Sequence, residues 1–229
     1  MSTLQALIFD FDGVIADTEP LHFAGLHHTL KEIGIELSES EYYTDYLGYD
    51  DRGCILAALA ANHRPADAAT VVRLMRRKAE AYLESVKDHQ VIFPGVPEFV
   101  RDAAATFPLA IASGALRHEI EYILDSAGLK SAFLHITSAE DVTRGKPDPQ
   151  PFLLALKALQ QRDPSLTSAS CLVIEDSLPG IRGARAAGMK VLAVANTHTV
   201  QDLHEAHAIT PSLLDANLME LRSRLWPAA

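Results

Sequence analysis

A run of apolar residues near the start of the chain ends in two aspartates. Residues 4–9 are apolar except for Gln5, and Asp10, Asp12 and Gly13 follow them closely. Such a run predicts a strand buried on both faces of a sheet, with the carboxylates at its carboxyl end. Carboxylates beside a core are costly unless a cation or hydrogen-bond donors neutralise them. The stretch therefore indicates either a site for a cation and an anionic ligand or an ordinary strand that ends in an acidic turn.

The size and charge of the chain narrow the classes of protein to which it can belong. Its 229 residues suit one large domain or one domain with an insertion, and 48% apolar with 22% charged residues is typical of a soluble globular protein. The net charge of −10 argues against a nucleic-acid partner, because phosphate backbones attract clustered Lys and Arg. We expect a monomer or weak dimer that acts on a small molecule.

The cysteines and the apolar runs indicate a cytoplasmic protein with no membrane partner. Cys54 and Cys171 lie far apart and form neither a disulfide framework nor a metal-binding spacing. The N-terminus lacks the basic and apolar regions of a signal peptide. No apolar run approaches the ~20 residues needed to cross a bilayer.

Residues from about 17 to 88 show helical patterns without a convincing strand. Apolar residues recur at three- and four-residue steps, first around Leu26 and Leu30 and later around Val71 and Met75. A crossover helix in an α/β unit needs far fewer residues than this block contains. The pattern therefore predicts a helical subdomain at 17–89, inserted into a core domain formed by 1–16 and 90–229.

From residue 91 onward, strand patterns alternate with helical ones. This alternation predicts an α/β fold with a parallel, doubly wound sheet and helices on both faces. The expected strands lie at 109–112, 134–137, 171–174 and 191–194.

Polar residues with different chemistry follow the expected strands or lie in the loops between them. In a doubly wound sheet, ligands bind outside the carboxyl ends of the strands, near the point where the strand order reverses. Taken singly, each group is also typical of a turn, a solvated loop or a helix cap. Their joint order favours a common site that contains Asp10, Asp12, Ser113, Gly114, Lys146, Glu175 and Asp176.

These residue types together suit the transfer of a phosphoryl group. Asp10 is a candidate nucleophile toward phosphorus, and Asp12 a candidate general acid and base. Lys146 would offset the negative charge of the phosphate and of the nucleophile. The Ser113 hydroxyl and the backbone N–H groups after it, at Gly114 and Ala115, would hold phosphate oxygens. Glu175 and Asp176 would complete an oxygen-ligand shell for Mg²⁺.

Four motifs make the chain resemble the haloacid dehalogenase superfamily, in the branch of β-phosphoglucomutase and related sugar-phosphate phosphatases. The resemblance covers nearly the whole chain and implies a Rossmann-like core with an inserted α-helical cap. The motifs are Asp10-Phe11-Asp12-Gly13-Val14, Ala112-Ser113-Gly114, Gly145-Lys146-Pro147-Asp148-Pro149 and Ile174-Glu175-Asp176-Ser177, the last continued by Pro179-Gly180-Ile181.

The resemblance also implies roles for the acidic residues. It makes Asp10 the nucleophile and Asp12 the acid and base. It implies Mg²⁺ bound by the Asp10 carboxylate, the Asp12 main-chain carbonyl and the Asp176 carboxylate, with Glu175 as a frequent helper. The dehalogenase and phosphonatase branches usually lack the second aspartate, so Asp12 favours phosphate-ester chemistry.

Within the resemblance, four cap residues are candidates for binding the substrate. His22 aligns with a histidine that mutases use near the substrate, although an ordinary first-turn helix histidine is an equal alternative. Gly48 and Arg52 lie where the mutase branch has a glycine and then an arginine for the distal phosphate, but here two aspartates intervene. Lys78 lies where the family often has a substrate-facing lysine, and a solvated basic face is the alternative for it.

The sequence therefore predicts a Mg²⁺-dependent phosphatase acting on a sugar or polyol phosphate through a phospho-Asp10 intermediate. The first alternative is a phosphomutase of the β-phosphoglucomutase type, which the displaced Arg52 disfavours. A receiver-like signalling module is a further alternative, but receivers are much shorter, lack a helical insertion and carry their phospho-accepting aspartate on a middle strand. A pseudo-enzyme is disfavoured because every core catalytic residue is present.

Overall fold

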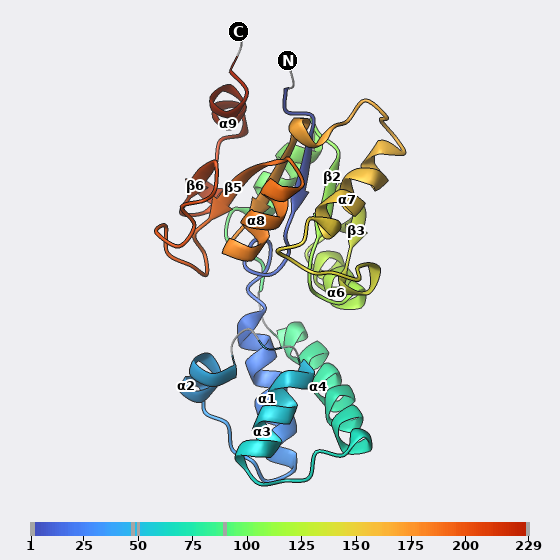
Figure 1. Cartoon of the computed structure of the whole chain (residues 1–229), viewed down its shortest axis with the longest axis vertical. Coiled ribbons are helices and arrows are strands. Elements are labelled where there is room, and N and C mark those ends of the chain that lie inside the picture. Colours follow the sequence, from blue (N-terminus) through green and yellow to red (C-terminus); the bar gives the residue numbers. More distant parts are fainter. Residues whose placement is uncertain (1–2, 47–48, 50, 89–90, 228–229) are drawn as a thin grey trace. The chain divides into compact units, whose positions relative to one another are not determined.

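The computed structural model describes residues 3–46, 49, 51–88 and 91–227. The chain forms two compact units (Figure 1). The larger unit comprises Met1–Asp17 and Ile92–Ala229, and the smaller unit comprises Thr18–Val91.

The larger unit is built on a six-stranded parallel sheet with the order β3-β2-β1-β4-β5-β6 (Figure 1). Along the chain the strands first progress from β1 to β3 in one direction and then from β4 to β6 in the other. The point of reversal lies between the neighbouring strands β1 and β4, where doubly wound folds place their ligands. The strands are β1 (Ala6–Phe9), β2 (Leu109–Ala112), β3 (Phe133–Thr137), β4 (Cys171–Glu175), β5 (Lys190–Val194) and β6 (Ala208–Thr210).

Helices pack on both faces of this sheet. On one face, Ile8 of β1 belongs to a buried cluster with Phe152 of α7 and Ile181 of α8. On the other face, the ring of Phe9 lies edge-on against Phe99 of α5, with 6.1 Å between the ring centroids. The helices are α5 (Val96–Ala104), α6 (Arg117–Ser126), α7 (Gln150–Gln160), α8 (Leu178–Ala186) and α9 (Leu218–Leu225).

The smaller unit is helical and has its own apolar core. Its first helix starts with Pro20 in the first turn, where a missing N–H costs nothing, and ends just before Gly34, whose φ of +74° an L side chain rarely adopts. Leu30, Ile55 and Val71 come from three different helices and share one buried cluster. The elements are α1 (Glu19–Glu32), α2 (Glu39–Glu41), the π-helical turn Tyr42–Tyr46, α3 (Asp51–Ala61) and α4 (Ala68–Asp88).

The structure confirms the predicted fold class, a doubly wound α/β core with a helical insertion. Two elements near the C-terminus, β6 and α9, were not predicted. β6 has only three residues, too few for a strand pattern to be visible, and its pairing with β5 defines it. α9 did have a sequence signal, because the side chain of Asn217 accepts hydrogen bonds from the N–H groups of Met219 and Glu220 as a helix cap.

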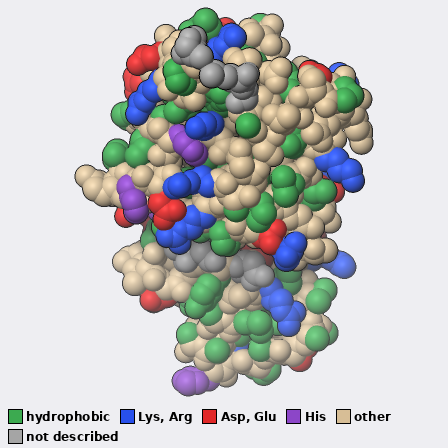
Figure 2. All heavy atoms as spheres, turned by 45° about the horizontal axis from the view of Figure 1, so that its top comes forward, with side chains coloured by type: hydrophobic (Ala, Val, Ile, Leu, Met, Phe, Trp, Pro, Cys, Tyr) green, Lys and Arg blue, Asp and Glu red, His purple; other side chains and the backbone are tan. Residues whose placement is uncertain are grey.

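The surface carries charges of both signs. On the face drawn in Figure 2, Lys and Arg side chains are interspersed with acidic and hydrophobic ones. Among the described residues, no helix combines the length and the apolar character that a membrane span requires.

Replacing Phe9 by alanine tests the packing that holds the end of β1 in place. The Phe9 ring is fully buried and contacts Phe99 and Phe133 edge-on, so its loss removes apolar burial and leaves a cavity. We expect the free energy of unfolding to fall by about 3–5 kcal/mol in denaturant titrations. Leu153→Ala, at a 43% exposed position on α7, is the matched control and should cost well under half as much. Equal losses for the two variants would contradict this packing.

Candidate active site

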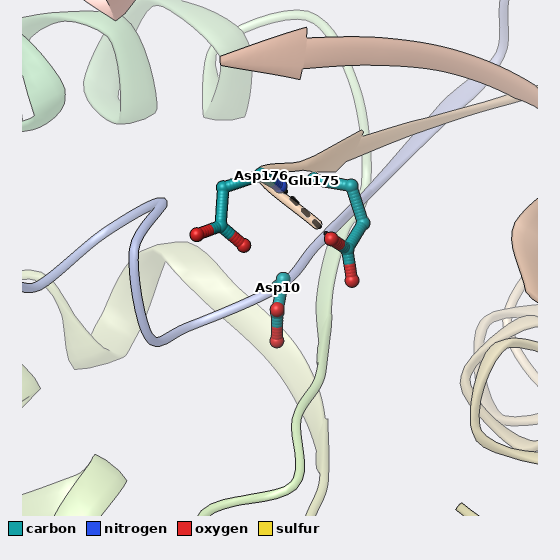
Figure 3. A group of neighbouring side chains, drawn as sticks. All are labelled: Asp10, Glu175 and Asp176. Carbon is teal, nitrogen blue, oxygen red and sulfur yellow. Dashed lines mark hydrogen bonds between the residues drawn. The ribbon is translucent and has the colours of Figure 1, made fainter. Parts of the chain in front are cut away.

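Three acidic residues lie together at the ends of β1 and β4. Phe9 pairs with Ile174 in the parallel ladder, so the residues that follow them, Asp10 and Glu175, lie at the same level of the sheet. The N–H of Asp10 donates to the carbonyl oxygen of Ile174 at 2.9 Å, which continues this register past the end of β1. Figure 3 shows the carboxyl groups of Asp10, Glu175 and Asp176. One oxygen from each of these groups lies within 4.8 Å of the other two. The topology thus creates an acidic cluster at the point where strand order reverses.

Lys146 connects two members of this cluster. Its Nζ lies 2.7 Å from Asp10 Oδ1 and 2.7 Å from Glu175 Oε1, and it also lies 5.3 Å from the centre of the Phe152 ring. Burial by itself would lower the pKa of Lys146, but the two carboxylates outweigh it and raise this pKa above its usual value. Lys146 is therefore a fixed positive charge between the ends of β1 and β4.

Glu175 is an anion held by protein donors on both of its oxygens. Its Oε1 accepts from Lys146, and its Oε2 accepts from the N–H groups of Asp176 and Ser177, both at 2.8 Å, and from the Ser177 hydroxyl at 2.9 Å. Burial raises the pKa of Glu175, but Lys146 and these hydrogen bonds bring it below its usual value. A Cβ at Gly180 would collide with this carboxylate, so the start of α8 packs directly on it.

Asp10 and Asp176 are less well neutralised than Glu175. Burial raises the pKa of Asp10 well above its usual value despite Lys146, and the neighbouring carboxylates add to this effect. Burial and the charge of Glu175 raise the pKa of Asp176 to about 6, against the opposing effect of a hydrogen bond from Thr197. The cluster thus contains more negative charge than Lys146 balances.

This donor set fits a divalent cation such as Mg²⁺. The available ligand atoms are carboxylate oxygens, which Mg²⁺ prefers, and three of them converge within 4.8 Å. A cation would also offset the unbalanced negative charge that raises the pKa values of Asp10 and Asp176. Asp10 and Asp176 are the residues best placed to hold it, because both oxygens of Glu175 already accept from protein donors.

Ser113 and Asp12 form a second part of the site. The Ser113 hydroxyl lies 3.4 Å from Asp12 Oδ2, so β2 and the loop after β1 meet here. The N–H of Ala115 donates to the Ser113 hydroxyl oxygen at 2.9 Å. A Cβ on Gly114 would have no neighbour within 4 Å, so packing does not require glycine at that position. Asp12, Ser113 and the backbone after it are thus grouped at the strand ends, as the sequence predicted.

Two of the predicted cap residues contact each other in the smaller unit. Lys78 is only 2% exposed, and its Nζ lies 2.7 Å from both His22 Nδ1 and Asp51 Oδ1. The expected alternative, a solvated Lys78, is therefore wrong for this residue. Arg52 is exposed on α3, and Gly48 lies outside the described residues.

His22 is neutral in this arrangement. A lysine ammonium can only donate, so His22 Nδ1 accepts and the ring proton is assigned to Nε2. The ring also lies against Tyr82, with 4.7 Å between centroids. Burial and the charge of Lys78 lower the pKa of His22 to about 3.

Two residues after β5 contact the site and were not predicted from the sequence. The Asn196 side chain donates to the carbonyl oxygen of Gly13, and the Thr197 hydroxyl donates to Asp176. The sequence does contain a pattern that points to them. Residues 196–199 are polar and closely follow the carboxyl end of a strand, where ligands bind in such sheets.

A parallel sheet whose order reverses beside buried carboxylates and a lysine is typical of α/β enzymes that act on small ligands. The chain belongs to the haloacid dehalogenase-like hydrolase family, whose sequence model matches residues 7–194. The family predicted from the sequence is thereby confirmed, as is the expectation that the protein is an enzyme of this hydrolase class.

Relatives cover nearly the whole chain. The protein CbbY of Rhodobacter capsulatus is 33% identical over 214 residues, which span 87% of this chain and 88% of that protein. The phosphoglycolate phosphatase of Mesorhizobium japonicum is 28% identical over 225 residues, which span 97% of each. The crystal structure of β-phosphoglucomutase from Clostridium difficile superposes with a TM-score of 0.79 at 21% identity over 97% of both chains, a likeness of fold.

The state of His22 predicts how stability depends on pH. The folded ring stays neutral down to about pH 3, whereas an unfolded histidine takes up a proton below its usual pKa of 6.5. The unfolded state therefore binds more protons between these values, and stability falls as pH falls from about 7 to about 4. We expect His22→Asn to lose less thermal stability than the wild type over this range.

Circular dichroism melts at several pH values measure this difference. The matched control is His118→Asn, at an exposed position on α6, and this variant should follow the wild type. Identical pH dependence in the wild type and His22→Asn would contradict a neutral, buried His22.

Proposed function

We propose that the protein is a Mg²⁺-dependent phosphatase that hydrolyses a small phosphorylated metabolite, a sugar or polyol phosphate, through a phospho-Asp10 intermediate. The main support for this proposal is the position of the Asp10 carboxylate, which Lys146 binds at the point where the strand order reverses. Membership of the hydrolase family and the likeness to a relative named phosphoglycolate phosphatase support the same reaction class.

The contacts of Asp10 suit a nucleophile. Its Oδ1 accepts from Lys146 at 2.7 Å and from the N–H of Phe11 at 2.8 Å. These donors hold the carboxyl group through Oδ1, and we assign the attack on phosphorus to its second oxygen. In the first step, a lone pair of this oxygen forms a bond to phosphorus while the bond from phosphorus to the ester oxygen breaks.

Asp12 carries the proton in both steps. In the first step it donates a proton to the departing ester oxygen, which leaves as an alcohol. In the second step it accepts a proton from water, whose oxygen attacks phosphorus and releases inorganic phosphate and the Asp10 carboxylate. The contact of Ser113 with Asp12 Oδ2 supports its orientation, and Ser113 together with the backbone of Gly114 and Ala115 would hold phosphate oxygens.

The proposed metal is held by the Asp10 and Asp176 carboxylates and by the main-chain carbonyl of Asp12, with Glu175 assisting. When bound, Mg²⁺ supplies positive charge that lets an anionic nucleophile approach an anionic phosphate. Glu175 assists by fixing Lys146 through its Oε1. Lys146 then offsets charge on Asp10 and on the transferring group.

We assign the choice of substrate to the helical unit, proposed as a cap domain over 17–89. His22, Gly48, Arg52 and Lys78 are its proposed substrate-binding residues. Because Asp51 lies 2.7 Å from Lys78, the positive charge of this lysine is largely balanced within the unit. This balance disfavours a second phosphate on the substrate and thus favours a phosphatase over a phosphomutase.

Asp10→Asn should abolish turnover and leave the fold intact. An amide of the same shape keeps the volume but is a poor nucleophile, so we expect kcat to fall by at least about 10³-fold. Phosphate release from a panel of sugar and polyol phosphates measures the loss, and circular dichroism reports on the fold. Asp102→Asn, at an exposed position on α5, is the control. Undiminished turnover by Asp10→Asn would overturn the proposed mechanism.

The same panel separates phosphatase from phosphomutase. We expect one ester to saturate at low KM with stoichiometric release of inorganic phosphate. With β-glucose 1-phosphate and a bisphosphate primer, an isomerised sugar phosphate without phosphate release would instead identify a mutase.

Magnesium should stabilise the metal-free protein through the acidic cluster. Binding to the folded state raises stability by RT ln(1 + [L]/Kd), which is about 2.7 kcal/mol at a concentration one hundred times Kd. We expect Mg²⁺ to raise the Tm of the wild type and to raise that of Asp176→Asn much less. Glu220→Gln, at an exposed position on α9, should respond like the wild type. Equal shifts in all three proteins would place the cation elsewhere.

A further inference from the structure

The turn after β5 contacts two acidic segments of the site at once. Asn196 Nδ2 donates to the carbonyl oxygen of Gly13 at 2.8 Å, and Gly13 directly follows Asp12. The next residue, Thr197, donates its hydroxyl proton to Asp176 Oδ2. Two adjacent side chains thus bind the loop after β1 and the end of β4.

Gly13 and Asp176 also pack tightly against each other. Gly13 has a φ of +75°, and a Cβ at this position would collide with the Asp176 carboxylate. The Cγ2 methyl of Thr197 lies 3.1 Å from the same Cβ position. The loop after β1, the end of β4 and the turn after β5 therefore meet at one point, where a shift of any one displaces the other two.

A third side chain orients the Thr197 hydroxyl. Its proton is donated to Asp176, so the oxygen is left to accept from His198 Nδ1, which lies 2.9 Å away. This assigns a continuous chain of hydrogen bonds from His198 through Thr197 to Asp176. Without it, the buried Asp176 carboxylate would lose a donor while it still faces the like charge of Glu175.

We propose that Asn196 and Thr197 are positioning residues for the metal site, acting on it through Gly13 and Asp176. This inference rests on the proposed function, which makes Asp176 and the Asp12 carbonyl metal ligands. A hydrogen bond to a ligating carboxylate fixes its orientation, and loss of such a partner typically costs 10–100-fold in metal affinity. Asn196 acts on the other proposed ligand segment, since its bond to the Gly13 carbonyl fixes the main chain beside Asp12.

Binding of Mg²⁺ alone, measured by calorimetry without substrate, tests this role. We expect Thr197→Val, which keeps the shape but removes the hydroxyl, to weaken Mg²⁺ binding about tenfold or more. Thr197→Ser keeps the hydroxyl and should restore affinity close to that of the wild type. Thr199→Val is the matched control, because the Thr199 hydroxyl in the same segment donates to Asp202 at 2.6 Å instead. Its Mg²⁺ affinity should be unchanged.

A second variant keeps the test decisive if Thr197→Val folds poorly. Asn196→Ala removes the side-chain donor to Gly13 and should also weaken Mg²⁺ binding, with kcat recovering at saturating Mg²⁺. Wild-type Mg²⁺ affinity in folded Thr197→Val or Asn196→Ala would overturn the positioning role, even if the wild type is an active phosphatase. A wild type that neither binds Mg²⁺ nor hydrolyses any phosphate ester would overturn the proposed function, and the positioning role with it.

Discussion

Lys146 lies between two buried carboxylates from neighbouring strands, and the arrangement of the site depends on this contact. Asp10 and Glu175 lie at the same level of the sheet because β1 and β4 pair in register, so their charges would repel without a cation between them. Removing one partner of a buried ion pair leaves an unpaired charge, which is strongly destabilising. Lys146 thus fixes the loop before α7 to the strand ends and sets the orientation of Asp10.

The site keeps more negative charge than its lysine can balance. Asp176 is buried beside Glu175, and its pKa of about 6 reflects that unfavourable position. A cluster with excess negative charge lowers the stability of the metal-free protein, and functional sites often have this effect. Under the proposed function, the same imbalance provides affinity for Mg²⁺, while Thr197 holds the Asp176 carboxylate and Asn196 holds the main chain at Gly13.

The sequence predicted those parts of the site that follow apolar runs. Asp10 directly follows β1 and Glu175 is the last residue of β4, so the rule for parallel sheets predicts that the two lie close together. Thr197 was missed because a threonine in a turn has no distinctive chemistry, and its contact with Asp176 depends on how β5 lies beside β4. The burial of Lys78 could not be predicted either, because the adjacent arginines suggest a solvated face of α4. The tertiary contacts of Lys78 with Asp51 and His22 show that it is buried.

In the proposed mechanism, Asp10, oriented by Lys146, receives the phosphoryl group. Rapid acid quenching of the enzyme during turnover of the best ester in the panel, followed by mass spectrometry of its peptides, tests this directly. We expect the peptide containing Asp10 to gain the mass of one phosphoryl group and fragmentation to place this group on Asp10. The same peptide from Asp10→Asn should carry no phosphoryl group. A phosphoryl group on another residue, or an unmodified Asp10 in an enzyme that is turning over, would contradict this mechanism.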